Sequence, residues 1–458
     1  MQCVAIDVGT SFTKASLVNV ATGQISQIRR TASIEANATS DELRVEIDAD
    51  KIVQQVRSLI DGLLDSSTDC KAILLCGQMG GLVLTDQSGQ AVLPYLSWLD
   101  KRLTAVRPGR SESWFESLAK IVGGRSETEL GNEFRPGLTL PLLFWLHQND
   151  PEVVKAGYLP CTLPDYVAAR LCDTIPVMEQ TCACGLLHVA AGKFAEDIFE
   201  DLNLHSLCWP QLVDFRHQVG RMKQRDGKAS IPVYAAVGDH QCSLLGTGLQ
   251  NGELSINVAT GSQISTVTAD AASGPFQLRP YFDGQLLKTI TNIPAGRSLS
   301  GLVRLLSETH QAIGDSADDA AAWDYFFQQA EAVTDSDMEA NLAFFPAVIE
   351  GPGNLSNLHE GNLTVGHVAH SSLKAMAGYY DQLASRLDRQ RPWSRGVLSG
   401  GVVQKSRLLQ RMIAERLQVP FRLASSTEDT LTGLTVLGRV ICGLSATVQE
   451  AQAALIAV

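Results

Sequence analysis

The chain has 458 residues, of which 45% are hydrophobic and 19% are charged, and its formal net charge is −12. This composition is typical of a globular protein. At roughly 100–200 residues per domain it predicts two or three domains and excludes a mainly disordered chain. The acidity disfavours a broad basic surface for nucleic acid. No run of 18 uncharged apolar residues occurs, which excludes a membrane span, and the first residues carry no cationic leader, so we expect a cytoplasmic protein.

The ten cysteines include one close pair, Cys182 and Cys184. A zinc site of the usual kind needs a second pair or a histidine at ligand spacing, and the sequence has neither. We therefore expect no zinc site. In a reducing compartment most of the thiols should be buried as small hydrophobic side chains.

In the first eighty residues the spacing of apolar residues changes from that of strands to that of a helix and back to that of a strand. In residues 50–64 the apolar positions fall on one face of a helix, for which Asp50 is the expected N-cap. Short apolar runs between turn residues predict strands, the first three in an antiparallel meander. These strands are residues 3–8, 13–20, 24–33 and 71–77. The order predicts a mixed α/β domain rather than a purely parallel one.

The second half of the chain has a similar order. A strand over 231–238 ends at Asp239, Asn251-Gly252 is typical of a hairpin turn, and residues 253–268 form one strand, or two with a turn at 259–262. A strand over 396–401 then precedes a helix. The apolar face of that helix carries Leu408, Leu409, Met412, Ile413 and Leu417. We interpret the two halves as sharing a topology, in which each half begins with a strand that ends at an aspartate.

The stretch 221–230 is polar and charged, as linkers often are. We therefore place a domain boundary there, which divides the chain into residues 1–225 and 226–458.

The turn after the first predicted strand has the residues of a phosphate site. Thr10 and Ser11 offer hydroxyl groups and exposed backbone N–H groups, and Lys14 adds a positive charge. Asp7 at the strand end suits Mg²⁺, held directly or through water. The alternative is an ordinary hairpin with a polar turn.

Two later segments repeat this chemistry. Thr260 and Gly261 form a second turn of the same kind, so that two turns could hold a polyphosphate from both sides. Gly400 and Gly401 lie between a strand and a helix, where small residues let a flat ring approach the backbone. A plain hairpin and a tight strand-to-helix turn are the corresponding structural alternatives.

Asp239 is the strongest candidate for a catalytic residue. A carboxylate at the end of a buried strand can accept the proton of a substrate hydroxyl. This is the role of the general base in phosphoryl transfer. Its alternative role is to cap the following helix. The neighbouring His240 either faces the substrate or is simply packed.

Taken together, these segments resemble the FGGY carbohydrate kinases of the actin/Hsp70/sugar-kinase superfamily. The resemblance runs in order over nearly the whole chain. Its elements are Asp7-x-Gly9-Thr10, Gly77-Gln78-Met79-Gly80-Gly81, Trp98-x-Asp100-x-Arg102, Asp165-Tyr166-Val167 with Arg170-Leu171, Gly238-Asp239, Thr260-Gly261-Ser262 and Gly400-Gly401. Within the family, residues 163–172, 238–243 and 363–368 are most similar to the sedoheptulokinases. Two positions depart from the family pattern: Gly80 stands where many ketose kinases have His, and Lys405 where a small polar residue is common.

The resemblance implies an α/β fold of two ribonuclease-H-like, actin-like ATPase domains that flank a central cleft and close over the substrates. It implies ATP and Mg²⁺ as cofactors, with Asp239 and Asp7 as catalytic residues and Asp7 at the metal. The implied ATP-binding residues are Thr10, Ser11, Lys14, Thr260, Gly261, Gly296, Gly400, Gly401 and Lys405. The implied substrate-binding residues are Gln78, Met79, Trp98, Asp239 and His240.

The implied function is ATP-dependent phosphorylation of a sugar hydroxyl. Sedoheptulose is the first choice of substrate, and D-xylulose, D-ribulose and other polyols are the alternatives. The partner is then a small sugar or polyol and neither nucleic acid nor membrane, and the resemblance leaves a homodimer open. Two alternatives from another class are an ATP-switched, non-enzymatic member of the superfamily and a degenerate sugar-binding regulator. The retained sugar-side elements disfavour the first, and the retained Asp7, Asp239 and phosphate turns disfavour the second.

Overall fold

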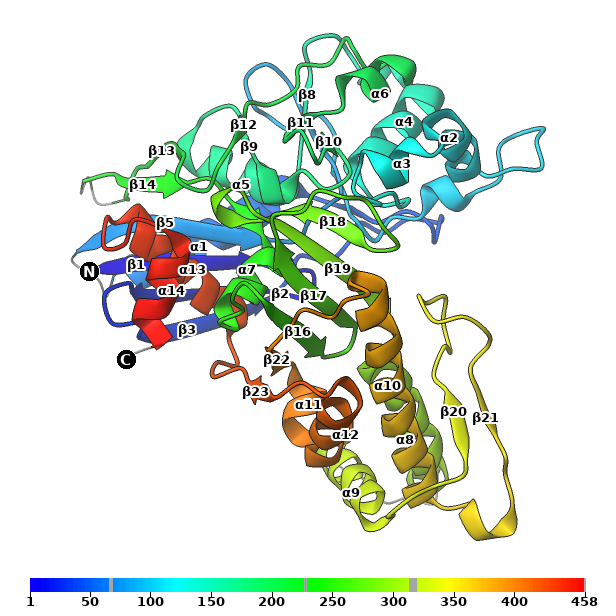
Figure 1. Cartoon of the computed structure of the whole chain (residues 1–458). Coiled ribbons are helices and arrows are strands. Elements are labelled where there is room, and N and C mark those ends of the chain that lie inside the picture. The colour runs from blue at the N-terminus through cyan, green and yellow to red at the C-terminus, as the bar shows by residue number, and fades with distance from the viewer. Residues whose placement is uncertain (66–68, 226, 228, 313–318, 457–458) are drawn as a thin grey trace.

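The computed structural model describes residues 1–65, 69–225, 227, 229–312 and 319–456, and it is built around two mixed β-sheets (Figure 1). The first half of the chain forms one sheet and the second half forms the other. Helices cover the faces of both sheets. The predicted mixed α/β organisation is confirmed.

The first sheet has the strand order β13-β14-β5-β1-β2-β3, and β15 also pairs with β5. The first three strands form the predicted antiparallel meander, while β5 runs parallel to β1, and β14 and β15 run parallel to β5. The strands are β1 (Gln2–Val8), β2 (Phe12–Asn19), β3 (Ile25–Ala32), β5 (Cys70–Gly77), β13 (Gln218–Met222), β14 (Ile231–Tyr234) and β15 (Val237–Gly238).

The helix predicted over 50–64 is α1 (Ala49–Leu64), but its N-cap is Asp48 rather than Asp50. The Asp48 carboxylate accepts a hydrogen bond from the backbone N–H of Lys51 at 3.1 Å. Asp50 lies in the first turn and accepts a hydrogen bond from the Tyr166 hydroxyl at 2.7 Å. Two aspartates precede the same apolar face, so the pattern alone did not decide which of them caps the helix.

Residues between β5 and β13 form a helical region on the first sheet. Its helices are α2 (Trp114–Val122), α3 (Arg125–Thr128), α4 (Thr139–Asn149), α5 (Leu163–Cys172) and α6 (Glu196–Asp201). Short strands pair as β4 (Glu46–Ile47) with β7 (Tyr95–Leu96), β6 (Val83–Thr85) with β8 (Leu159–Cys161), β9 (Met178–Glu179) with β12 (Leu212–Val213) and β10 (Leu187–His188) with β11 (Lys193–Phe194).

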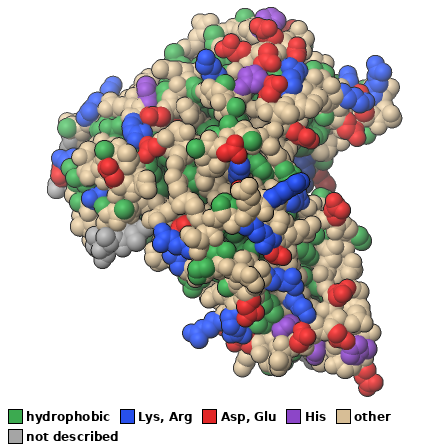
Figure 2. Space-filling view, in the orientation of Figure 1, with side chains coloured by type: hydrophobic (Ala, Val, Ile, Leu, Met, Phe, Trp, Pro, Cys, Tyr) green, Lys and Arg blue, Asp and Glu red, His purple; other side chains and the backbone are tan. Residues whose placement is uncertain are grey.

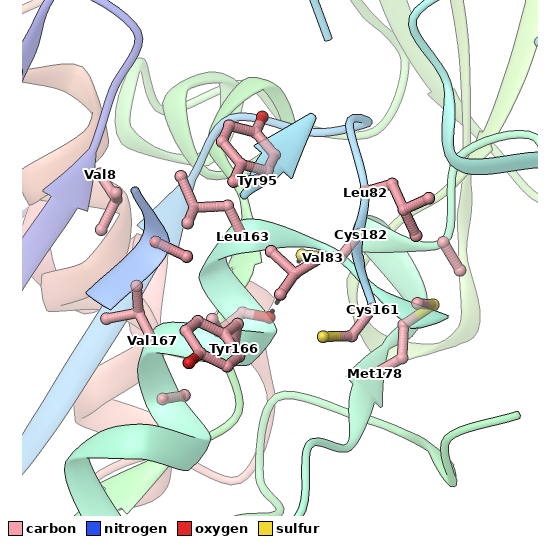
Figure 3. Packing of buried hydrophobic residues seen from close by; sticks show 14 of the residues in the cluster. Val8, Leu82, Val83, Tyr95, Cys161, Leu163, Tyr166, Val167, Met178 and Cys182 are labelled. Carbon is pink, nitrogen blue, oxygen red and sulfur yellow. Dashed lines mark hydrogen bonds between the residues drawn. The ribbon is translucent and has the colours of Figure 1, made fainter. Parts of the chain in front are cut away.

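The segment Asp165-Tyr166-Val167 belongs to the core of this region. Thr162 and Asp165 form a capping box at the start of α5, in which the Asp165 carboxylate accepts from the Thr162 hydroxyl at 2.6 Å. Tyr166 and Val167 are fully buried in the same hydrophobic cluster as Leu163 and Tyr95 (Figure 3). This part of the resemblance therefore marks packing and helix capping.

The second sheet repeats the pairing of the first, with the order β18-β19-β17-β16-β22-β23. Antiparallel β16, β17 and β19 correspond to β1, β2 and β3, and parallel β22 and β23 correspond to β5 and β14. The strands are β16 (Glu253–Val258), β17 (Ser262–Thr268), β18 (Gln277–Pro280), β19 (Leu286–Ile293), β22 (Arg395–Ser399) and β23 (Phe421–Leu423). Residues 253–268 are thus two strands with a turn, and the halves do share a topology.

The correspondence differs from the predicted one in its starting strand. The strand before Asp239 belongs to the first sheet, so the counterpart of β1 is β16. In the hairpin register, Asn257 of β16 then occupies the place of Asp7. Asn251-Gly252 leads from a helix into β16 and does not join two paired strands, so it is not a hairpin turn.

The boundary expected at residue 225 also falls inside the first sheet. β13 and β14 pair antiparallel across residues 223–230, so this polar stretch connects two strands of one sheet. Turns and linkers have the same composition, which is why the sequence did not separate them. We propose a division after Gly238, where the first sheet ends.

Three helices lie between the two sheets and join them. They are α7 (Asp239–Gly246), α13 (Asp429–Ile441) and α14 (Val448–Ile456). Their apolar residues form one buried cluster with Cys3, Ala5 and Leu74 of the first sheet and with Val267 and Val397 of the second. In Figure 1 the red C-terminal helices accordingly lie beside the blue N-terminal strands.

The opposite face of the second sheet is covered by the remaining helices, with a separate buried core between them. These are α8 (Gly296–Ala312), α9 (Asp319–Ala332), α10 (Val365–Leu387), α11 (Gly401–Lys405) and the predicted amphipathic helix α12 (Arg407–Leu417). A small hairpin, β20 (Glu339–Asn341) with β21 (Asn354–Ser356), extends from this part of the molecule (Figure 1).

The alternation of side chains along β1 determines which face of the sheet Asp7 lies on. Successive side chains of a strand point to opposite faces. On β1, Val4, Ile6 and Val8 pack in the core of the helical region, whereas Cys3 and Ala5 pack in the cluster with α7 and α13. Asp7 has the parity of the second set, so its carboxylate points toward α7 and α13.

Helices α7 and α13 cross in direct backbone contact at two glycines. A Cβ atom on Gly246 would overlap the carbonyl oxygen of Asp429, and one on Gly433 would overlap that of Cys242. The missing side chains thus let the last turn of α7 lie against the first turn of α13. The crossing places Asp429 beside the C-terminal end of α7 and Thr430 within reach of Asp7, whereas Asp239 lies at the opposite end of α7.

Gly433→Ala tests the crossing. The added methyl group meets backbone rather than a flexible side chain, so we expect the free energy of unfolding to fall by about 2 kcal/mol or more. Urea denaturation measures it. The matched control is Gly301→Ala in α8, where a Cβ atom meets nothing within 4 Å, and it should be neutral or stabilising by up to about 1 kcal/mol. Equal stability of the two variants would contradict the account.

Candidate functional site

Asp7 lies close to Asp239 of α7 and is hydrogen-bonded to the first turn of α13, which begins at Asp429. Asp7 ends β1 and is 8% exposed, while Asp239 and Asp429 are half-buried first residues of their helices. The Thr430 hydroxyl donates to Asp7 Oδ2 at 2.8 Å, which ties α13 to β1. Asp239 and Asp429 each begin a helix, and the N-terminal end of a helix favours negative charge.

Burial and mutual repulsion raise the pKa values of these acids. Burial raises the pKa of Asp239 to about 7, with the charge of Asp7 as the next cause. Burial also raises the pKa of Asp7, against the hydrogen bond from Thr430. The pKa of Asp429 is raised to about 6 by burial and by Glu428. Asp239 is therefore a carboxylate that both holds and releases a proton near neutral pH.

Lys14 supplies the positive charge of this cluster. It pairs in register with Asp7 across the β1–β2 hairpin, and its ammonium group forms an ion pair with Glu428 at 2.6 Å. Lys14, the residue predicted to bind phosphate, thus lies at the site, where it is paired with the carboxylate of Glu428 just before α13. A phosphate group at this point would compete with Glu428 for Lys14.

The cluster has the donor set of a hard divalent cation. Mg²⁺ binds carboxylate oxygens and keeps several of its waters. Asp7 and Asp239 offer neighbouring carboxylate groups. Asp429, next to the Thr430 that donates to Asp7, has a buried Oδ1 without a hydrogen-bond partner among the described residues. The residues present therefore fit Mg²⁺, for which Asp7 remains our predicted ligand.

The predicted sugar-side residues meet the first phosphate turn. The Trp98 indole donates to the Thr10 hydroxyl at 3.0 Å, and that hydroxyl lies 3.3 Å from the Gln78 side-chain oxygen. Met79 contacts the strand end before Asp239, since a Cβ atom on Gly238 would lie 2.6 Å from its sulfur. Predicted substrate residues and the predicted base therefore lie in one neighbourhood.

A cavity of about 260 Å³ opens beside these residues. It is lined by Met79, Trp98, Leu99, Lys101 and Arg135, among others. At the adjacent Gly80, φ is +81°, and a Cβ atom would lie 2.9 Å from Leu138. The backbone and the packing both require glycine at this position.

His240 is held by a buried arginine. The Arg279 guanidinium on β18 donates to His240 Nδ1 at 2.8 Å. Burial, then the charges of Arg279 and Arg135, hold the pKa of His240 well below its usual range. The imidazole is therefore neutral at neutral pH.

Most of the predicted nucleotide residues come together on the second sheet. Thr260 and Gly261 form the β16–β17 turn, where no atom lies within 4 Å of a Cβ built on Gly261. Gly296 donates its N–H to Ala259 O at 3.0 Å. Gly400, with φ at +94°, packs on the backbone of Val258.

Gly401 and Lys405 begin and end the short helix α11 next to this group, and both are exposed. No described contact joins Lys405 to the other predicted residues, so its role stays a prediction. Ser11 is likewise an exposed residue of the first turn.

Sequence reasoning missed the residues that α13 brings. Glu428, Asp429 and Thr430 precede the apolar stretch 431–441, which is a helix-start signal. That signal predicts where a helix begins, but it gives no indication that this helix start contacts Asp7, which lies 423 residues earlier in the chain. Glu133 and Arg279, a buried ion pair beside His240, were missed for the same reason.

Comparison with known proteins decides the family. Residues 2–246 match the model described as the FGGY family of carbohydrate kinases, N-terminal domain. The chain belongs to this family. The matched range includes β14, β15 and α7, which agrees with a first sheet that continues past residue 225.

Two curated relatives and one solved structure illustrate the likeness. The chain is 27% identical to a xylulose kinase of Bacillus subtilis over 57% of this chain and 52% of that protein, so this match spans about half of the relative. It is 22% identical to a sedoheptulokinase of Mus musculus over 91% of this chain and 93% of that protein. A crystal structure of Plasmodium falciparum glycerol kinase with ADP superposes with a TM-score of 0.82 at 16% identity, covering 99% of this chain and 92% of that one.

These likenesses establish the fold as that of the FGGY sugar kinases, with two actin-like ATPase domains. Among the described residues, no helix is both long and apolar enough to cross a membrane. On the face drawn in Figure 2, acidic and basic side chains are interspersed.

Proposed function

We propose that this FGGY family member catalyses the ATP-dependent phosphorylation of a ketose hydroxyl, with sedoheptulose as the first candidate. The observation that carries the proposal is the position of Asp239. Asp239 is the first residue of α7 and lies close to Asp7. Gly238, the residue before it, contacts Met79 of the predicted sugar side. Burial raises the pKa of Asp239 to about 7. Phosphoryl transfer needs a carboxylate between an acceptor hydroxyl and a metal–phosphate site.

In this proposal each half of the molecule holds one substrate. Gln78, Met79, Trp98 and His240 bind the sugar, and Asp239 accepts the proton of the reacting hydroxyl. Thr10, Ser11 and Lys14 from the first turn, and Thr260 and Gly261 from the second, hold the phosphates. Gly296, Gly400, Gly401 and Lys405 line the nucleoside site, where the missing side chains leave room for a flat ring.

Mg²⁺, when bound at Asp7, would neutralise the phosphate charge. Asp7 and Asp239 repel one another without a cation, and this repulsion is one reason for the raised pKa of Asp239. The residues' own part is to bring the hydroxyl, the base and the phosphates into line and to exclude water from them.

The sugar preference rests on resemblance and on the long alignment with the mouse sedoheptulokinase. D-xylulose, D-ribulose and other polyols are the alternatives, since the B. subtilis relative is a xylulose kinase. Gly80 stands where many ketose kinases have His, and Leu138 already fills the space beside it, so no imidazole reaches the pocket from this position. An ATP-switched regulator without kinase activity is the alternative from another class.

A substrate panel tests the proposal. With Mg-ATP, ADP release should rise strongly with one ketose among sedoheptulose, D-xylulose and D-ribulose, and remain low without sugar because water is excluded from the site. A coupled ADP assay measures it. Binding of ATP with no stimulation by any ketose or polyol would overturn the kinase function and favour the regulator.

Asp239→Asn tests the role of the base. The amide keeps the shape of the carboxylate but accepts no proton, so turnover should fall by about 10²-fold or more while sugar binding stays near that of the unchanged protein. Turnover is read from ADP release, and binding is read by calorimetry. Asp61→Asn on the outer helix α1 is a matched control that should leave turnover unchanged. Near-normal turnover of Asp239→Asn would refute the role.

A further inference from the structure

A buried ion pair connects the two halves of the molecule next to His240. Arg279 on β18 is 4% exposed and Glu133, from the loop before α4, is 2% exposed, and the Arg279 Nε–H donates to Glu133 Oε1. Arg135 pairs with the other oxygen of Glu133 at 3.1 Å. The three charges form a continuous row, Arg135–Glu133–Arg279, that ends at His240.

The backbone supports this row. Leu278 donates its N–H to Gly131 O at 2.8 Å, and a Cβ atom on Gly131 would overlap Leu278 O. The loop that carries Glu133 therefore lies directly on the strand that carries Arg279. Because the backbones are in contact, the guanidinium has little freedom to move away from His240.

The contact determines which nitrogen of His240 carries the proton. A guanidinium has N–H donors and no acceptor, so at 2.8 Å His240 Nδ1 must be the acceptor. The single proton of the neutral ring is then on Nε2. Nε2 is buried and has no partner among the described residues, a state that costs free energy until an acceptor arrives.

We propose that Arg279, held by Glu133, is a positioning residue that fixes His240 as an Nε2–H donor to an oxygen of the sugar. This inference rests on the proposed function and deepens it. Arg135 lines the same cavity as Met79 and Trp98, so the charged row begins at the candidate sugar pocket and ends at the residue next to the base.

The arrangement selects a class of substrate. A site with a buried, otherwise unpaired donor discriminates strongly against an analogue that lacks the matching oxygen. The preferred sugar therefore carries a second oxygen, carbonyl or hydroxyl, besides the hydroxyl that faces Asp239. Gly80 offers no imidazole, and His240 supplies one from α7 instead.

A double-variant cycle tests the proposal, with the ketose that is most active in the substrate panel as the probe. His240→Phe keeps a ring without nitrogen, and Arg279→Met keeps the length of the side chain without donors. Each change should raise KM about tenfold or more, with a smaller effect on kcat. Because Arg279 acts through His240, the two changes together should raise KM no further than His240→Phe alone.

Two further variants separate positioning from folding. Arg279→Lys keeps a charged donor and should recover part of the lost affinity. Glu133→Gln combined with Arg279→Met removes both buried charges, and it replaces the single variant in the cycle if Arg279→Met does not fold. Arg411→Met, an exposed arginine on α12, should leave KM unchanged.

Additive effects of the two changes, or an unchanged KM in His240→Phe, would overturn the inference while the kinase function stands. If the unaltered protein phosphorylates no ketose, the proposed function itself fails. The two failures are therefore distinguishable in one set of assays.

Discussion

The site depends on the crossing of α7 and α13 at Gly246 and Gly433. Neither helix carries a side chain at the contact, so their backbones touch and the last turn of α7 lies against the first turn of α13. Asp239 and Asp429 begin these helices, and Thr430 donates to Asp7. A distance of more than 400 residues along the chain is thereby closed into one cluster. The same helices fill the space between the two sheets, so the contact that assembles the site also joins the domains.

The cluster is electrostatically costly in the protein alone. Its acids are buried and repel one another, which raises the pKa values of Asp7, Asp239 and Asp429. Lys14, paired with Glu428, and two helix N-termini compensate only part of this charge. A metal–nucleotide complex would supply the missing cation. The net charge of −12 is therefore no obstacle to an anionic ligand, because local groups rather than global charge determine binding in the site.

The two halves share a strand order, but they differ in the side chains at the ends of their strands. At the position of Asp7 the second sheet has Asn257, which donates to the Ser399 hydroxyl at 2.9 Å. Asp7 thus ends a strand of the first sheet and Asp239 directly follows another, whereas the second sheet offers glycines and a hydroxyl-bearing turn. This asymmetry is what the proposed division between sugar side and nucleotide side requires.

Local patterns in the sequence predicted local structure well. The apolar runs gave β1, β2 and β5, and the helical period gave α1 and α12 within a few residues. The two glycine-bearing turns were also predicted at their places. Asp48 rather than Asp50 caps α1, because two adjacent acids satisfy the same signal. The hairpin at 223–230 was mistaken for a linker, because both are polar and only the pairing of β13 with β14 separates them.

Contacts between distant segments could not be predicted. Nothing in the residues around Thr430 or Arg279 indicates that they meet Asp7 and His240, because such meetings depend on how helices and sheets pack. The family resemblance supplied Asp7 and Asp239 but neither of these partners. The charged row that ends at His240 became visible only when burial and distance were known.

The central claim is that the assembled cluster transfers a phosphoryl group from ATP to a sugar hydroxyl. The most direct test is to follow the label from ATP carrying ¹⁸O in its γ-phosphate, with mass spectrometry of the products in the presence of Mg²⁺ and the preferred ketose. The account predicts one labelled sugar phosphate for each ADP formed. Labelled inorganic phosphate together with unmodified sugar would contradict it, because water rather than the sugar would then be the acceptor.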